Sequence, residues 1–209
     1  MPFVSCGGWV AARGWCCWEV DETAVWRGDR VTCIVGIENA GRVYIGGDSA
    51  GVAGLSIQTR RDPKVFAVGE LIIGYTSSFR MGQLLRFNLS VPPRIEREDD
   101  DFEWMVKRLV PEIRETLKEG GYATVNNGEE SGGVFLVGYR GSLYEIESDF
   151  QVAMPADGYA AVGCGSDIAL GSLHGSKRLD PIKRIERALS ASEHHSAGVR
   201  GPFVIKETT

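Results

Sequence analysis

The sequence contains no long uninterrupted apolar run, and it contains no cluster of basic residues. A helix that crosses a membrane takes about 20 consecutive apolar residues, and no stretch of the 209 residues approaches that length. The formal net charge is -5, and the lysines and arginines are dispersed along the chain, which argues against a nucleic-acid partner. We therefore expect neither a membrane protein nor a nucleic-acid-binding protein.

Cysteine and histidine are scarce, with five and three residues respectively. The five cysteines are an odd number without regular spacing, so they do not indicate a disulfide framework, and no CxxC pair indicates a zinc site. His194 and His195 are neighbours in a predicted helix, where adjacent side chains point apart, so we expect surface residues rather than metal ligands. The composition predicts no metal, no cofactor and a reducing, cytoplasmic location.

Tryptophan is almost absent after residue 31. Residues 1–31 hold four of the five tryptophans and three of the five cysteines, so the composition changes sharply at that point. The segment has no basic start followed by an apolar core, which makes it a poor signal peptide. We therefore treat residues 1–31 as an extension and residues 32–209 as the folded domain.

Three explanations of this extension stay open. It is a propeptide that is removed, a disordered or docking extension, or a misassigned start upstream of the true one at Val31. We favour the third explanation, because a GTG start codon is read as valine inside a longer frame. Initiation there and removal of the initiator methionine would leave Thr32 as the first residue.

The remaining chain has the length and composition of one soluble globular domain, with 43% hydrophobic and 24% charged residues. Apolar runs at 33–37 and 43–47 flank a turn at 38–41, which indicates a hairpin. The same reasoning predicts further strands at 64–68, 71–76, 132–138, 143–148, 150–153, 158–162 and 199–206, and a brief pairing of 56–59. Apolar positions spaced by three and four predict helices from 77 to about 89, over 102–119 with a bend at Pro111, over 167–174 and over 181–195. Residues 48–54 and 122–131 are predicted loops.

The order of these elements is hairpins, helices, hairpins, helices and a last strand. Each predicted helix has an apolar stripe that must be buried against another element. Periodicity alone therefore predicts an α+β fold.

Three residues with chemical potential occupy the ends of predicted strands. Thr32 precedes the first strand, Asp48 follows two glycines at the end of the second, and Lys64 opens the third. Sixteen positions separate Thr32 from Asp48, and sixteen more separate Asp48 from Lys64. This spacing, with its glycines, resembles that of active proteasome β subunits and of the bacterial proteasome-like heat-shock peptidase. Both are N-terminal-nucleophile (Ntn) hydrolases, and the resemblance extends from residue 32 to about residue 203.

The resemblance implies a four-layer αββα sandwich and a threonine nucleophile. The Thr32 hydroxyl would attack an amide carbonyl while its own α-amine takes the proton, since a hydroxyl is a weak nucleophile without a base. Lys64 would lower the pKa of that amine, and Asp48 would hold the lysine in place. In self-cleaving members of the family a glycine precedes the threonine, whereas Val31 stands here.

The resemblance also implies supporting residues. Ser77 or Ser78 occupies the place of a glycine whose backbone N–H forms the oxyanion hole, although a serine there is first of all a helix cap. Cys164 replaces a serine that hydrogen-bonds near the N-terminal threonine, and a thiol is a poorer partner. Glu193 and Ser196 keep the spacing of an aspartate and a serine that lie near the α-amine.

The sequence thus predicts a proteasome-like threonine endopeptidase acting on peptides or unfolded proteins. The resemblance implies a homo-oligomeric ring, to which an ATPase unfoldase could deliver substrates. Two alternatives are a small-molecule amidase on the same fold and a catalytically silent ring subunit. Cys33 would become the nucleophile if processing also removed Thr32, but Asp48 and Lys64 are spaced for Thr32.

Overall fold

The computed structural model describes residues 31–94, 100–126 and 128–208. The predicted extension, residues 1–31, lies outside the described residues except for Val31. In the described part of the chain, no helix combines the length and the apolar character needed to cross a membrane.

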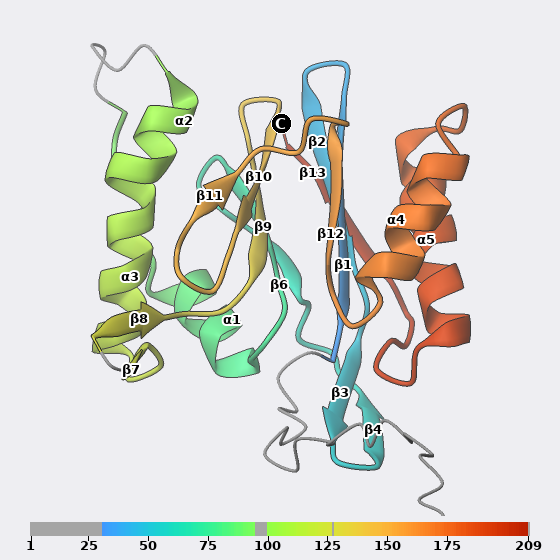
Figure 1. The fold of residues 1–209 in the computed structure, drawn as a ribbon, viewed down its shortest axis with the longest axis horizontal. Helices are drawn as coiled ribbons and strands as arrows, with labels where there is room; N and C mark the ends of the chain where they lie inside the picture. Colours follow the sequence, from blue (N-terminus) through green and yellow to red (C-terminus); the bar gives the residue numbers. More distant parts are fainter. Residues whose placement is uncertain (1–30, 95–99, 127, 209) are drawn as a thin grey trace, which may run out of the picture.

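Two antiparallel sheets form the centre of the molecule (Figure 1). The first has the order β12 (Tyr159–Gly163), β1 (Cys33–Asn39), β2 (Arg42–Gly47) and β13 (Val204–Glu207). The second has the order β11 (Val152–Ala153), β10 (Ser142–Ile146), β9 (Phe135–Tyr139), β6 (Leu71–Tyr75) and β5 (Val65–Val68). Two separate hairpins are β3 (Ala50–Ala53) with β4 (Ser56–Thr59), and β7 (Thr124–Asn126) with β8 (Glu129–Ser131).

Helices cover the outer face of each sheet (Figure 1). Against the first sheet lie α4 (Ser166–Gly175) and α5 (Pro181–His195), and against the second lie α1 (Phe79–Phe87) and α3 (Val110–Glu119). Before α3, and continuous with it, come α2 (Asp101–Trp104) and the π-helical turn η1 (Met105–Leu109).

Three apolar clusters hold these layers together. One joins the first sheet to α4 and α5, and another joins the second sheet to α1, η1 and α3. The third lies between the sheets and contains Ile34, Ile45, Ile72 and Leu136 among its residues. Burying one face of each helix and both faces of the sheets removes the apolar stripes from water, which is the main stabilising term in folding. The α+β prediction is confirmed.

Most predicted elements are present, and the differences have local causes. The predicted loops 48–54 and 122–131 contain the strands β3, β7 and β8, since small and polar residues can still pair in a two-stranded hairpin. Where a bend was predicted at Pro111, the helix contains the wider turn η1, which ends two residues before this proline, a residue with no N–H. The last strand begins at Val204 rather than at residue 199, because Pro202 cannot donate to a ladder.

Candidate active site

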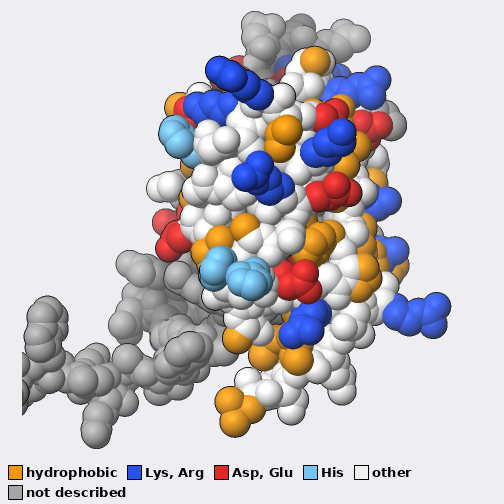
Figure 2. All heavy atoms as spheres, turned by 90° about the vertical axis from the view of Figure 1, so that its right-hand side faces the viewer, with side chains coloured by type: hydrophobic (Ala, Val, Ile, Leu, Met, Phe, Trp, Pro, Cys, Tyr) orange, Lys and Arg blue, Asp and Glu red, His pale blue; other side chains and the backbone are white. Residues whose placement is uncertain are grey.

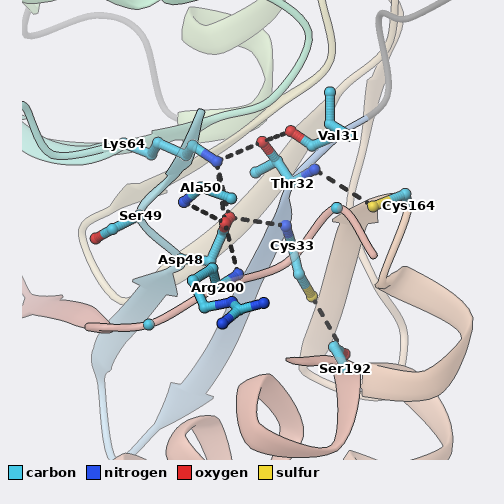
Figure 3. A network of polar contacts seen from close by, with 12 residues as sticks. Val31, Thr32, Cys33, Asp48, Ser49, Ala50, Lys64, Cys164, Ser192 and Arg200 are labelled. Atoms are coloured by element: carbon cyan, nitrogen blue, oxygen red, sulfur yellow. Dashed lines mark hydrogen bonds and ion pairs between the residues drawn. The ribbon is translucent and has the colours of Figure 1, made fainter. Parts of the chain in front are cut away.

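Thr32, Asp48 and Lys64 meet where the two sheets approach each other (Figure 3). Thr32 lies directly before β1, Asp48 directly after β2, and Lys64 directly before β5 of the other sheet. The side chains are almost fully buried, with residue exposures of 3% for Thr32, 1% for Asp48 and 2% for Lys64. The three residues that the sequence spacing singled out are therefore brought together by contact between the sheets.

The ammonium group of Lys64 connects the other two side chains. Its Nζ donates to Thr32 Oγ1 at 2.7 Å and to the two carboxylate oxygens of Asp48 at 3.0 and 3.1 Å. The Thr32 hydroxyl in turn donates to the carbonyl oxygen of Val31. A cation that donates to a hydroxyl oxygen stabilises negative charge on that oxygen, so this contact favours nucleophilic chemistry at Thr32.

Backbone amides hold the Asp48 carboxylate in place. Its Oδ1 accepts from the Cys33 amide at 3.1 Å, and its Oδ2 accepts from the amides of Ala50 at 2.8 Å and Arg200 at 3.3 Å. Three fixed backbone donors thus orient the carboxylate in addition to the Lys64 side chain. The Arg200 amide could not be foreseen from the sequence, because it comes from the chain that leads into β13.

Burial sets the electrostatics of the Lys64–Asp48 pair. Removal from water lowers the pKa of Lys64 below that of an exposed lysine, and the neighbouring Asp48 carboxylate opposes this shift. An unpaired charge at this depth would be costly, so each of the two groups compensates the other.

The two glycines before Asp48 permit this close packing. A Cβ on Gly46 would lie 2.2 Å from Ile185 of α5, and a Cβ on Gly47 would lie 2.9 Å from Val65. The end of β2 is therefore pressed between a helix and the strand that follows Lys64, as the prediction of a close backbone approach requires.

The backbone nitrogen of Thr32 lies beside the exposed Cys164. It donates to Cys164 Sγ at 3.4 Å, and that sulfur lies 3.2 Å from Ser196 Oγ. Cys164 thus contacts Thr32 directly, and Ser196 is linked to it through the sulfur of Cys164.

Glu193 is not near Thr32 in the described contacts. Its Oε1 accepts from the Gly201 amide at 3.0 Å and lies 3.9 Å from Arg200 Nε. The carboxylate therefore holds the chain before β13. Arg200 also donates its amide to Asp48, so the segment that Glu193 contacts reaches the site.

The turn between β6 and α1 distinguishes Ser77 from Ser78. Ser78 is the helix cap, since its side chain accepts from the Arg80 amide and its own amide donates to Thr76 at 2.7 Å. Ser77 has a φ of 61°, the left-handed conformation that favours glycine. Among the described residues, its amide has no hydrogen-bond acceptor. Ser77 is thus the residue of this turn with a glycine-like conformation and an available amide.

Cys33 is an unsuitable nucleophile. It is fully buried, and its Sγ lies 3.5 Å from Ser192 Oγ. Burial raises the pKa of the Cys33 thiol to about 12, so the thiolate is scarce at neutral pH. Ser192, which the sequence analysis did not single out, lies on the inner face of α5 one turn after Leu189.

His174, His194 and His195 are exposed, and Figure 2 shows pale blue histidine side chains at the surface of the face that it draws. The prediction that they point apart is wrong: the rings of His194 and His195 pack edge to face, 4.6 Å between centroids, where α5 ends. In the ranges that the structure describes, no group of three or more histidine, cysteine or acidic residues could hold a metal ion.

A cavity of about 540 Å³ opens beside these residues. Its lining includes Thr76, Ser77 and Gly163, and Gly163 packs so closely on Thr32 that an added Cβ would lie 2.2 Å from the Thr32 carbonyl oxygen. The cavity thus borders the turn after β6 and a glycine that packs on the Thr32 backbone, while Thr32 itself is not among its lining residues. Its volume lies within the range of about 300–1,000 Å³ that is usual for binding pockets.

Comparison with solved structures shows what this arrangement is similar to. BPH from Thiobacillus denitrificans, a bacterial proteasome homologue solved in complex with epoxomicin, matches 85% of this chain and 98% of its own. The TM-score is 0.70 at 19% sequence identity. The chain has the proteasome-like fold.

Two further proteins with the proteasome-like fold match over a similar extent. Eukaryotic HslV from Trypanosoma brucei has a TM-score of 0.59 at 16% identity and covers 84% of this chain and 98% of its own. Anbu, the ancestral beta-subunit from Yersinia bercovieri, has a TM-score of 0.60 at 15% identity and covers 85% and 81%. At the level of sequence, no protein-family model and no curated protein matches. The resemblance to proteasome-like proteins is confirmed, and it concerns the fold.

Proposed function

We propose that this protein is an N-terminal-threonine hydrolase that cleaves peptide bonds. The observation that carries this proposal is the 2.7 Å contact of Lys64 Nζ with Thr32 Oγ1, made by a lysine that Asp48 holds in a proteasome-like fold. Burying an ammonium group is costly unless its charge is compensated. A catalytically silent subunit would gain nothing from placing such a group against a threonine hydroxyl.

The chemistry begins when Thr32 is the first residue of the chain. The Oγ1 atom attacks the substrate carbonyl carbon, and the Oγ1 proton passes to the free α-amine of the same residue, directly or through one water. The unperturbed pKa of an α-amine, about 7.7–8.0, lies close enough to neutrality for it to accept a proton once a nearby cation lowers it. Lys64 is that cation, and it also stabilises the charge that develops on Oγ1.

The attack gives a tetrahedral intermediate with a negatively charged oxygen, and this intermediate then collapses. The Ser77 amide donates to the oxyanion, and the leaving amine takes the proton that the α-amine had accepted. An ester on Thr32 Oγ1 remains. Water adds to this ester while the α-amine again accepts a proton, and the peptide acid leaves with the threonine restored. Cys164 and Ser196 keep the amine in place through the contact at Thr32 N.

In this proposal, Thr32 gains its free amine because translation starts one codon before it. Translation from the codon of Val31 followed by removal of methionine exposes it, which divides the chain into residues 1–31 and the hydrolase domain 32–209. Val31 packs closely on Gly198, where an added Cβ would lie 2.6 Å from the Val31 side chain, so the site also accommodates a residue before Thr32. A propeptide that is cut before Thr32 would give the same active form.

We extend the proposal to the architecture and assembly of the Ntn hydrolases. The three apolar clusters support a four-layer αββα sandwich. The subunits would form a homo-oligomeric ring in the cytoplasm, receive peptides or unfolded proteins, and cooperate with an ATPase unfoldase. A single high-mass species in native mass spectrometry would support the ring, and a monomer at micromolar concentration would argue against it.

Epoxomicin provides the test, because it is bound in the solved BPH structure. We expect one inhibitor adduct on the N-terminal peptide of the processed protein, no adduct in Thr32→Ala and a strongly reduced yield in Lys64→Ala. Hydrolysis of fluorogenic peptides should be lost in parallel. A processed chain with Thr32 at its terminus that forms no adduct and cleaves no peptide would contradict the proposal and favour a silent ring subunit. An adduct together with cleavage of small acyl amides only would favour the amidase.

A further inference from the structure

The cavity beside Thr32 carries two carboxyl groups that the proposed chemistry does not use. Glu145 and Glu147 both line it, together with Ser131 and Ser148. Cavities that bind peptide side chains are mostly apolar with a few placed polar groups, so two acidic residues in one wall require an explanation.

The strand β10 directs Glu145 toward the space between the sheets. Leu143, two residues earlier, belongs to the apolar cluster between the sheets, whereas Tyr144 and Ile146 belong to the cluster under the helices. Side chains alternate along a strand, so Glu145 shares the face of Leu143. Its partner in register is Leu136, another residue of the cluster between the sheets. The carboxyl group therefore lies at the open end of the same layer that holds Thr32.

The two carboxyl groups lack a counter-ion in the described structure. None of the residues that line the cavity is a lysine or an arginine, and neither carboxyl group forms an ion pair with a described cation. Burial is the main reason why the pKa of Glu145 is raised to about 7, and the charge of Glu147 and a hydrogen bond between the two side chains raise it further. A cation bound between the two carboxyl groups would offset both the cost of burying them and their mutual repulsion.

We propose that the cavity binds a lysine or arginine side chain of the substrate, and that Glu145 and Glu147 determine this specificity. The inference rests on the proposed function, because the lysine or arginine must belong to a substrate in which Thr32 attacks a nearby peptide bond. Charge-assisted hydrogen bonds from an ammonium or a guanidinium group to two carboxylates are stronger than neutral ones, and the serines at the rim can take further donors.

The test compares lysine with norleucine, which has the same aliphatic chain without the ammonium group. In a set of fluorogenic peptides, each of the three residues before the cleaved bond is changed in turn to lysine, arginine or norleucine. The value of kcat/KM is then measured for each peptide with the processed protein. At one of these positions, we expect lysine and arginine to exceed norleucine by about tenfold or more, as is typical of close charge pairs. The double variant Glu145→Gln/Glu147→Gln should bring this ratio close to one.

A matched control removes the same charge elsewhere. Glu119→Gln/Glu186→Gln changes exposed glutamates on α3 and α5 and should keep the preference for lysine. The charge-reversed Glu147→Lys should favour an acidic residue at the same position. Circular dichroism shows that each variant is folded.

The outcomes separate the two proposals. An enzyme that is labelled by epoxomicin but cleaves lysine and norleucine peptides equally, or whose preference survives in the double glutamine variant, overturns this inference alone. A protein that is neither labelled nor active overturns the proposed function and this inference with it.

Discussion

At the scale of single residues, the buried ammonium group of Lys64 has the largest predicted effect. In Lys64→Ala, Asp48 keeps its three amide donors but loses its cation, so we expect a free energy of unfolding lower by about 3–5 kcal/mol. Peptide hydrolysis should fall by about 10²–10⁴-fold, the usual contribution of a group that assists proton transfer. Urea unfolding and initial rates measure the two effects. A variant with wild-type rates would contradict the assigned role of Lys64.

The thiol of Cys164 is the second residue with a distinct prediction. It is exposed and lies 3.4 Å from Thr32 N, whereas Cys33 is fully buried. N-ethylmaleimide should therefore modify Cys164 in the processed protein and block the site with the added group. Cys164→Ser should stay active in the presence of the reagent, because a hydroxyl does not react. Equal inactivation of wild type and Cys164→Ser would place the sensitive thiol elsewhere.

Glu145 gives a prediction about pH. Its pKa is raised from the ordinary value of 4.5 to about 7, so between these values the folded state holds a proton that the unfolded chain has released. The stability of the wild type should therefore decline as the pH rises through this window, relative to Glu145→Gln, which cannot titrate. Urea unfolding at several pH values from 4.5 to 7.5 measures the difference. Parallel plots of stability against pH for the wild type and Glu145→Gln would contradict the raised pKa. As a control, Glu186→Gln changes an exposed helix residue, and its plot should be parallel to that of the wild type.

At the scale of elements, the turn between β6 and α1 combines strain with a useful contact. Ser77 has a φ of 61°, and its Oγ accepts from the Val134 amide at 3.2 Å. Ser77→Gly and Ser77→Ala both lose this bond, but only glycine accepts the left-handed conformation without steric cost. We expect the glycine variant to be more stable than the alanine variant by about 1 kcal/mol. Equal midpoints in chemical denaturation would show that the turn is not strained.

The same scale shows what could be predicted from the sequence. The hairpins and α5 were predictable because their patterns are local: an apolar run, a turn residue and a helix period lie within a few positions. The meeting of Thr32, Asp48 and Lys64 was implied by the resemblance of their spacing to that of proteasome β subunits, because the position of each residue at a strand end is by itself weak evidence. Which of Ser77 and Ser78 holds the glycine position was not, because this depends on the φ of one residue in a turn.

Non-local packing explains the remaining differences. Glu193 reaches the chain before β13 rather than the amine, because the path of residues 196–203 decides where a longer acid can bind. Glu145 and Glu147 alternate along an ordinary strand pattern. Their exposure to a cavity follows only from how the second sheet packs against β12. Such features require the three-dimensional arrangement of segments that lie far apart in the sequence.

At the scale of the whole molecule, everything proposed for the site depends on where the chain begins. The Thr32 nitrogen is an amide as long as Val31 precedes it, and an amide cannot accept the hydroxyl proton. The proteasome-like fold brings Lys64 and Asp48 to Thr32 in either case, so the fold alone does not make the enzyme.

The intact mass of the protein purified from its own cells tests this point most directly. The account predicts the mass of a chain that begins at Thr32, with Thr32 as the first residue in N-terminal sequencing. A stable cellular protein that retains residues 1–31 joined to Thr32 would contradict it.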